Sequence, residues 1–134
     1  MDRVFLDANV LFSAAYRPRS RLHALWRLKD VVLLTSDYAL EEAHRNLETR
    51  AQLRRLEDVI AGMEIVYGVR VDAPLPSGIT LPEKDRPILA AAIQGRATHL
   101  VTSDVSHFGK YFGVAAGGVA ILLPAEYLRG KLNK

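Results

Sequence analysis

Short apolar runs alternate with helix-like patterns along most of the chain. Continuous runs rich in valine, leucine and isoleucine are typical of buried strands in a parallel sheet. Such strands are expected at residues 4–6, 31–34, 63–71, 100–102 and 119–123. Segments in which apolar residues recur every three or four positions predict helices between the strands. Helices are expected from about residue 10 to Pro18, at about 20–29, 38–47 and 51–62, at 86–94, and from Pro124 onward.

This alternation predicts an α/β fold, a three-layer α/β/α sandwich around a mainly parallel sheet of about five strands. The connections between successive parallel strands should be right-handed. Two segments are expected to be connections: 73–82, which holds three of the six prolines, and 113–118, whose glycines lack a phosphate-loop pattern. Gly95 is expected to end the helix at 86–94.

The composition fits one globular domain covering residues 1–134, with 49% hydrophobic and 25% charged residues. The sequence has no cysteine, which excludes disulfides and thiolate metal sites within it. The apolar run near the N-terminus is too short for a signal peptide. No stretch approaches the roughly 18 apolar residues of a membrane span. We therefore expect a cytoplasmic protein without a membrane partner.

The charge balance is basic, with a net charge of +3 and an isoelectric point of about 9.4. Arginine and lysine cluster at residues 17–29 and 45–55. Such clusters favour binding to a phosphate backbone through counterion release. They are also common on solvated helix faces, because both residues are good helix formers. Charge alone leaves both interpretations open.

Three aspartates occupy positions where the predicted fold would form a site. Asp7 ends the first predicted strand and Asp104 ends the fourth. In an open α/β sheet, ligands bind beyond the carboxyl ends of the strands. Asp85 precedes Ile88 and Leu89 by three and four residues, so it shares the apolar face of its helix at the first turn. An inward carboxylate of this kind needs a partner, because burying an unpaired charge is costly.

Each aspartate also has a purely structural interpretation. Asp85 can cap the N-terminus of its helix, and Asp7 and Asp104 can form Asx turns at strand ends. The convergence of three carboxylates at one edge favours a functional site, because they would repel and raise each other's pKa unless a cation were bound. Oxygen ligands, without cysteine or histidines at metal-ligand spacing, suit Mg²⁺ or Mn²⁺.

Four motifs around the acidic residues resemble those of the PIN-domain nucleases. Val4–Leu11 resembles the first motif of that family, an apolar strand followed by Asp-x-Asn, and Ser36–Ala43 resembles the second, a helix that carries an active-site glutamate. Asp85–Ala92 and Leu100–Asp104 resemble the third and the fourth. The motifs occur in the order of the family and span almost the whole chain. Their detail is closest to the bacterial and archaeal PIN proteins related to VapC-type toxins.

The resemblance implies a catalytic and metal-binding acidic quartet: Asp7, Glu42, Asp85 and Asp104. It implies support by hydrogen bonding from two further residues: Asn9 and Ser103. The pairs Glu41/Glu42 and Glu83/Asp85 leave open which acid is used, and helical geometry does not decide between the two glutamates. We choose Glu42 because Ala43 follows it, where the family usually has an apolar residue.

The resemblance also implies chemistry and partners. The metal ion, Mg²⁺ or Mn²⁺, would lower the pKa of a water that attacks an RNA phosphodiester, leaving a 5′-phosphate and a 3′-hydroxyl. Candidates for contact with the RNA are Arg17, Arg19, Arg21, Arg45 and His107. His107 is also a candidate acid. The implied biological role is the toxin of a toxin–antitoxin pair, with an antitoxin protein as partner and a homodimer as assembly.

Two other functions compete with the ribonuclease. A phosphotransferase of the haloacid-dehalogenase kind would use Asp7 as its nucleophile with a second aspartate two residues later, where the sequence has Asn9. A PIN-fold module that binds RNA or protein without cleavage would also fit the motifs. The presence of all four acids argues against a decayed site.

Overall fold

The computed structural model describes residues 1–132 and contains one six-stranded sheet. The order of the strands is β3-β2-β1-β4-β6-β5, and all neighbours are parallel except the pair of β5 and β6. The strands are β1 (Asp2–Leu6), β2 (Val31–Ser36), β3 (Glu64–Val66), β4 (His99–Val101), β5 (Ala115–Ala116) and β6 (Val119–Leu122). The central strands are apolar on both faces, as expected for a sheet covered on both sides.

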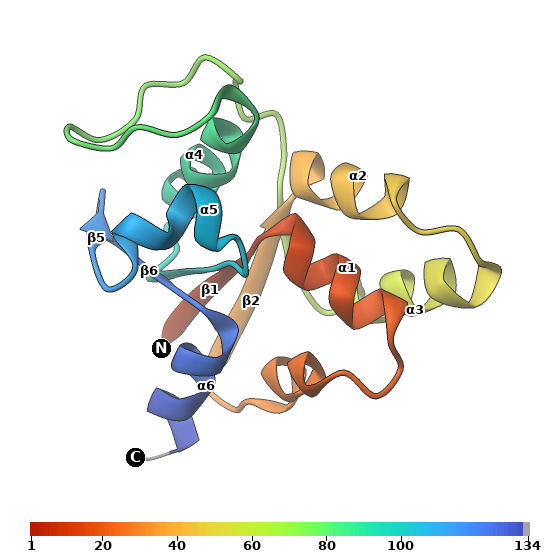
Figure 1. Ribbon diagram of the computed structural model, residues 1–134. Coiled ribbons are helices and arrows are strands. Elements are labelled where there is room, and N and C mark those ends of the chain that lie inside the picture. The colour runs from red at the N-terminus through yellow and green to blue at the C-terminus, as the bar shows by residue number, and fades with distance from the viewer. Residues whose placement is uncertain (133–134) are drawn as a thin grey trace.

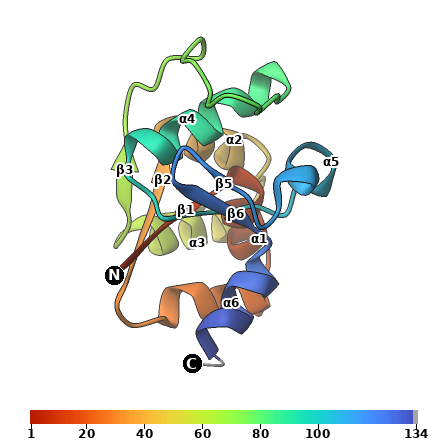
Figure 2. The same cartoon turned by 90° about the vertical axis from the view of Figure 1, so that its left-hand side faces the viewer.

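Helices cover the sheet on both faces (Figures 1 and 2). The helices are α1 (Ala8–Tyr16), α2 (Asp37–Arg45), α3 (Arg50–Ile60), α4 (Arg86–Gln94), α5 (Val105–Phe108) and α6 (Pro124–Leu132). Three short 3₁₀ helices are η1 (Arg21–Arg27), η2 (Glu83–Asp85) and η3 (Gly109–Tyr111). None of the helices in residues 1–132 is both long and apolar enough to cross a bilayer.

The core divides into two clusters, one on each face of the sheet. Phe5 packs with the buried residues of α4 and with Phe108 of α5 on one face. Its strand neighbours Val4 and Leu6 pack with α1, α3, η1 and α6 on the other. This split follows from the alternation of side chains along a strand. The observed layers confirm the predicted α/β/α sandwich.

Three local features differ from the predictions. The segment expected to be a helix at 20–29 is the 3₁₀ helix η1, and the strand expected at 63–71 is only the three residues of β3. The segment 113–118, expected to be a connection, contains the short strand β5, which was not predicted. Gly117 and Gly118 follow β5 with φ angles of 59° and 84°, which suit the tight turn of a two-residue hairpin into β6.

The central strand β1 lies between β2, which follows it in the chain, and β4 from the second half of the chain. The order of the strands therefore changes direction at β1, which is where an open α/β sheet forms its ligand crevice. Asp7 and Asp104 follow the carboxyl ends of β1 and β4, two hydrogen-bonded neighbours. The fold thus brings together two acids that are far apart in the sequence.

Candidate active site

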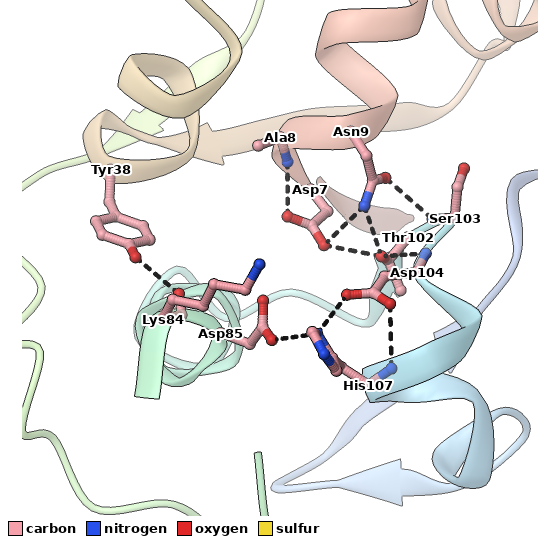
Figure 3. A network of polar contacts seen from close by, with 10 residues as sticks. All are labelled: Asp7, Ala8, Asn9, Tyr38, Lys84, Asp85, Thr102, Ser103, Asp104 and His107. Atoms are coloured by element: carbon pink, nitrogen blue, oxygen red, sulfur yellow. Dashed lines mark hydrogen bonds and ion pairs between the residues drawn. The ribbon is translucent and has the colours of Figure 1, made fainter. Parts of the chain in front are cut away.

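An acidic cavity of about 440 Å³ opens at the carboxyl ends of β1 and β4. All four acids of the predicted quartet line it: Asp7, Glu42, Asp85 and Asp104. They come from four separate segments, namely the end of β1, α2, the start of α4 and the start of α5. Figure 3 shows three of the four, Asp7, Asp85 and Asp104, around one space. Four like charges so close together need compensation by a cation or by protonation.

Asp7 is the most buried of these acids, with 5% of its surface exposed. One oxygen, Oδ1, accepts a hydrogen bond of 2.6 Å from the backbone N–H of Ala8, so Asp7 caps α1. The other, Oδ2, accepts a bond of 2.8 Å from the hydroxyl of Thr102. Burial raises the pKa of Asp7 to about 6; the two hydrogen bonds oppose this rise, and the charges of Asp85 and Glu42 add to it.

A small hydrogen-bond network fixes Asp7 (Figure 3). The side-chain amide of Asn9 approaches Asp7 Oδ2 at 3.4 Å and Thr102 Oγ1 at 3.3 Å. Asn9 Oδ1 accepts a bond of 3.0 Å from the backbone N–H of Ser103. Asn9 therefore links the first turn of α1 to the loop after β4. Ser103 contributes through its backbone, whereas the hydroxyl that contacts Asp7 belongs to Thr102.

Asp85 lies at the N-terminus of α4 with 8% of its surface exposed. Its side chain makes no capping hydrogen bond to that helix, so the structural alternative of an N-cap does not account for it. Burial raises its pKa, as does the neighbouring charge of Asp104, while His107 and Lys84 act in the opposite direction. Asp85 Oδ2 is buried without a hydrogen-bond partner among residues 1–132.

The two carboxylate oxygens of Asp104 make different contacts. Its Oδ1 accepts a bond of 3.1 Å from the backbone N–H of His107 and so caps α5. Its Oδ2 lies 2.9 Å from His107 Nδ1. Asp104 can therefore form a turn at the start of α5 and also line the acidic cavity, because one oxygen makes the cap and the other faces His107.

The structure distinguishes the members of the two acidic pairs. Glu42 lines the acidic cavity, whereas Glu41 is exposed and forms an ion pair of 3.3 Å with Arg45 one helical turn away. Asp85 lines the acidic cavity, whereas Glu83 lines a separate cavity. In each pair the sequence-based choice is the acid that faces the other carboxylates.

The four arginines suggested for RNA contact do not line the acidic cavity, whereas His107 lies against two of its acids. Arg17 follows α1 and lines an adjacent cavity with Phe12 and Tyr16. Phe12 lines the acidic cavity as well, so the two cavities adjoin there. Arg19 is exposed in the loop before η1, and Arg21 begins η1. All three arginines lie along the segment that follows α1.

Sequence reasoning did not single out three residues that surround the acids. Thr102 is completely buried against Asp7. Lys84 lines the cavity beside Asp85, and its backbone carbonyl accepts a bond of 2.7 Å from the hydroxyl of Tyr38. Burial and the nearby charge of Glu42 raise the pKa of Tyr38 to about 12, so its hydroxyl remains a donor. The only sequence signal for Lys84 and Thr102 is their position next to motif acids.

The donor set fits a divalent cation. Asp85 Oδ2 is a buried carboxylate oxygen without a hydrogen-bond partner in the described chain, and such an atom is stable only if something else compensates its charge. The surrounding carboxylate oxygens are the ligands that Mg²⁺ and Mn²⁺ prefer. One further residue, His107, offers a ring nitrogen within the same cluster.

A mostly parallel α/β sheet with carboxylates gathered at its switch point defines the class of this protein. Residues 3–106 match the family described as PIN domain, and the chain belongs to that family. No curated protein matches the sequence. The predicted resemblance to the PIN-domain family and the predicted fold are thereby confirmed, and chains in two solved structures of VapBC2 and VapC20 share the fold.

Two solved structures illustrate the likeness. A chain in the crystal structure of VapBC2 from Rickettsia felis, bound to a DNA fragment from its promoter, has a TM-score of 0.63 at 15% identity. The alignment covers 89% of this chain and 96% of that chain. VapC20 from Mycobacterium tuberculosis, described as a Sarcin-Ricin loop cleaving toxin, has a TM-score of 0.53 at 15% identity. That alignment covers 77% of this chain and 92% of the other.

Proposed function

We propose that this protein is a divalent-metal-dependent endoribonuclease that acts as the toxin of a toxin–antitoxin pair. One observation carries the proposal: four acids from four segments line a single cavity at the switch point of a PIN-domain sheet. The toxin role is supported by the structural likeness to VapBC2 and to VapC20, the latter described as a Sarcin-Ricin loop cleaving toxin.

In this proposal the metal is held by the four carboxylates: Asp7, Glu42, Asp85 and Asp104. A bound Mg²⁺ or Mn²⁺ lowers the pKa of water and stabilises charge that develops on the phosphoryl oxygens. The side chains of Asn9 and Thr102 hold Asp7 in one orientation. Because Asp7 accepts hydrogen bonds at both oxygens, its carboxylate is oriented before a metal arrives.

The basic residues beyond the cavity would guide the RNA backbone. Arg17, Arg19, Arg21 and Arg45 are exposed and can contact phosphates. Contacts of this kind position the RNA without selecting its sequence. We further propose an antitoxin protein as partner, a homodimer as assembly and the cytoplasm as location. Light scattering of the purified protein, alone and after co-expression with a neighbouring small reading frame, tests both assemblies.

The decisive experiment compares matched pairs of variants in cleavage of a structured RNA with Mg²⁺ or Mn²⁺. Glu42→Gln should reduce the rate by about 10²–10³-fold, the loss expected when one electrostatic contact to the transition state is removed. Glu41→Gln, its neighbour on the same helix, should cleave like the unmodified protein. Asp85→Asn and Glu83→Gln form a second pair with the same expectation.

The alternative function is a PIN-fold module that binds RNA or protein without cleaving. RNA binding without any metal-dependent cleavage, in the protein with all four acids intact, would support this module and contradict the nuclease. Equal rates for Glu41→Gln and Glu42→Gln would contradict the assignment of the site while leaving the activity in place. EDTA should abolish cleavage, and added Mg²⁺ or Mn²⁺ should restore it.

A further inference from the structure

The imidazole of His107 lies between two of the cavity acids (Figure 3). Its Nδ1 atom is 2.7 Å from Asp85 Oδ2 and 2.9 Å from Asp104 Oδ2. Although these distances are short, the contact with Asp85 lacks hydrogen-bond geometry, and both Asp85 Oδ2 and His107 Nδ1 are buried without a hydrogen-bond partner in residues 1–132. Three atoms that can donate electron pairs therefore face one point.

The arrangement of the three atoms matches one face of a coordination sphere. Asp85, Asp104 and His107 each offer one ligand atom, and the three atoms lie within 4.8 Å of one another. An octahedral ion with ligands at roughly 2.1 Å separates adjacent ligand atoms by about 3 Å. The two distances from His107 Nδ1 are close to this spacing.

The chain holds the histidine in this place. The backbone N–H of His107 bonds to Asp104 Oδ1, so its ring and Asp104 Oδ2 share one face of the α5 turn. The next residue, Phe108, is completely buried and anchors α5 in the core. The cap of α5 and the packing of Phe108 therefore hold the backbone of His107 beside the two acids.

We propose that His107 Nδ1 is a ligand of the divalent ion, together with Asp85 and Asp104, and that this nitrogen makes the site prefer Mn²⁺ to Mg²⁺. This inference rests on the proposed function, because it concerns the metal of the same site. A ring nitrogen suits first-row transition ions, whereas Mg²⁺ is a hard ion that takes oxygen ligands. Coordination through Nδ1 places the ring proton on Nε2.

A spectroscopic experiment tests the ligand without reference to activity. Electron spin-echo spectra of the Mn²⁺-loaded protein should contain modulation from a directly bound ¹⁴N nucleus. Labelling of histidine with ¹⁵N should change that modulation in the unmodified protein, where folding is not in question. The modulation should disappear in His107→Gln and persist in His44→Gln, a control at an exposed histidine of α2.

Calorimetric titration with each metal alone tests the preference. His107→Gln should weaken Mn²⁺ binding by roughly tenfold or more while changing Mg²⁺ binding much less, since a glutamine offers only oxygen and nitrogen of an uncharged amide. The ratio of the Mn²⁺ and Mg²⁺ affinities, rather than either affinity alone, is the readout. A purely structural role for His107 would weaken the binding of both ions equally.

The outcomes separate this inference from the proposed function. Bound Mn²⁺ without histidine modulation, or an unchanged affinity ratio in His107→Gln, would overturn the histidine ligand and leave the nuclease proposal standing. Absence of Mn²⁺ and Mg²⁺ binding to the unmodified protein would overturn both. Histidine modulation that survives in His107→Gln would assign the ligand to another histidine and also overturn the inference.

Discussion

The hydroxyl of Thr102 donates a hydrogen bond of 2.8 Å to Oδ2 of Asp7 and so joins the ends of β4 and β1. The hydroxyl oxygen of Thr102, Oγ1, also accepts bonds from the backbone N–H of Asp104 at 3.1 Å and from the side-chain amide of Asn9 at 3.3 Å. Both of its lone pairs are thus used, and its single proton is available for Asp7. The network is therefore built around a carboxylate that accepts at both oxygens.

This relationship makes Thr102 a sensitive position. Thr102→Val keeps the shape but removes the hydroxyl, so Asp7 loses a donor and the backbone N–H of Asp104 loses its acceptor. We expect a loss of about 1–3 kcal/mol in the free energy of unfolding, the usual effect of leaving buried polar groups unpaired. Thr102→Ser keeps the hydroxyl and should retain both the network and most of the cleavage rate. Urea unfolding and RNA cleavage measure the two effects, and equal stability of the two variants would contradict the network.

The raised pKa of Asp7 predicts an unusual dependence of stability on pH. Unfolded aspartate ionises near pH 3.9, whereas Asp7 in the folded protein ionises near pH 6. Between these values the folded state binds more protons than the unfolded state, so metal-free stability should fall as pH rises from about 4 to 6, by about 3 kcal/mol. The raised pKa of Asp85 acts in the same direction.

The control for this pH effect is Asp7→Asn, in which the decline over the same interval should be reduced. Thermal unfolding between pH 4 and 8, with EDTA present, measures the difference between the two proteins. A divalent ion binds the folded state only, so adding Mn²⁺ at pH 7 should raise the melting temperature of the unmodified protein. Parallel pH profiles for the protein and the variant would contradict the assigned pKa.

Periodicity and strand ends predicted most of what positions the site. Asp85 shares its helix face with Ile88 and Leu89, and this spacing alone predicted that it points inward. The alternation of strands and helices predicted a mainly parallel sheet, whereas the order of its strands, which brings the ends of β1 and β4 together, is seen only in the structure. Glu42 did not follow from periodicity, because it lies beside the apolar stripe of α2. Only the motif resemblance selected it.

The remaining features depend on contacts between distant segments. Arg55 belongs to a basic cluster that suggested RNA contact, yet its guanidinium bonds to the carbonyl of Ala15 at 2.8 Å, at the end of α1. Thr102 lies within the fourth motif, but nothing in that motif marks its hydroxyl as a partner of Asp7, and this role arises from the pairing of β4 with β1. Tertiary contacts of this kind leave no periodic signal in the sequence.

The C-terminus of α4 shows a second such case. Gly95 ends α4 as predicted, but its φ is −77°, and it is Arg96 that adopts the left-handed conformation, with a φ of 57°. Gly95 is instead required by space, since a Cβ there would lie 2.7 Å from Leu34 Cδ1 and 2.8 Å from Val66 Cγ2. The residue in the left-handed conformation is therefore Arg96, one position after the glycine.

The tight packing at Gly95 and the left-handed conformation of Arg96 predict opposite effects of substitution on the free energy of unfolding. Gly95→Ala should destabilise the protein by about 1–3 kcal/mol through overpacking against β2 and β3. Arg96→Gly should stabilise it by up to about 1 kcal/mol, because glycine adopts the left-handed conformation without strain. Gly62→Ala, where a Cβ meets no atom within 4 Å, is the control for overpacking. Urea unfolding of the three variants checks the signs, and a stabilising Gly95→Ala would refute the packing argument.

Lys84 places a positive charge in the cavity that the four acids line, where it opposes the rise in the pKa of Asp85 that burial causes. In the view of Figure 3 its side chain extends beside Asp85 toward Asp7. A cation here repels a divalent ion but attracts the phosphate of the RNA, so Lys84→Met should bind Mn²⁺ more tightly and RNA more weakly.

The slope of the logarithm of RNA affinity against the logarithm of salt concentration should decrease in magnitude by about one in Lys84→Met, as expected for one lost phosphate contact. Lys29→Met makes the same change of charge at an exposed position before β2 and should leave the affinity for Mn²⁺ nearly unchanged. Calorimetry with Mn²⁺ and filter binding of RNA at several salt concentrations measure the two effects, and a loss of both affinities would indicate a structural role for Lys84 instead.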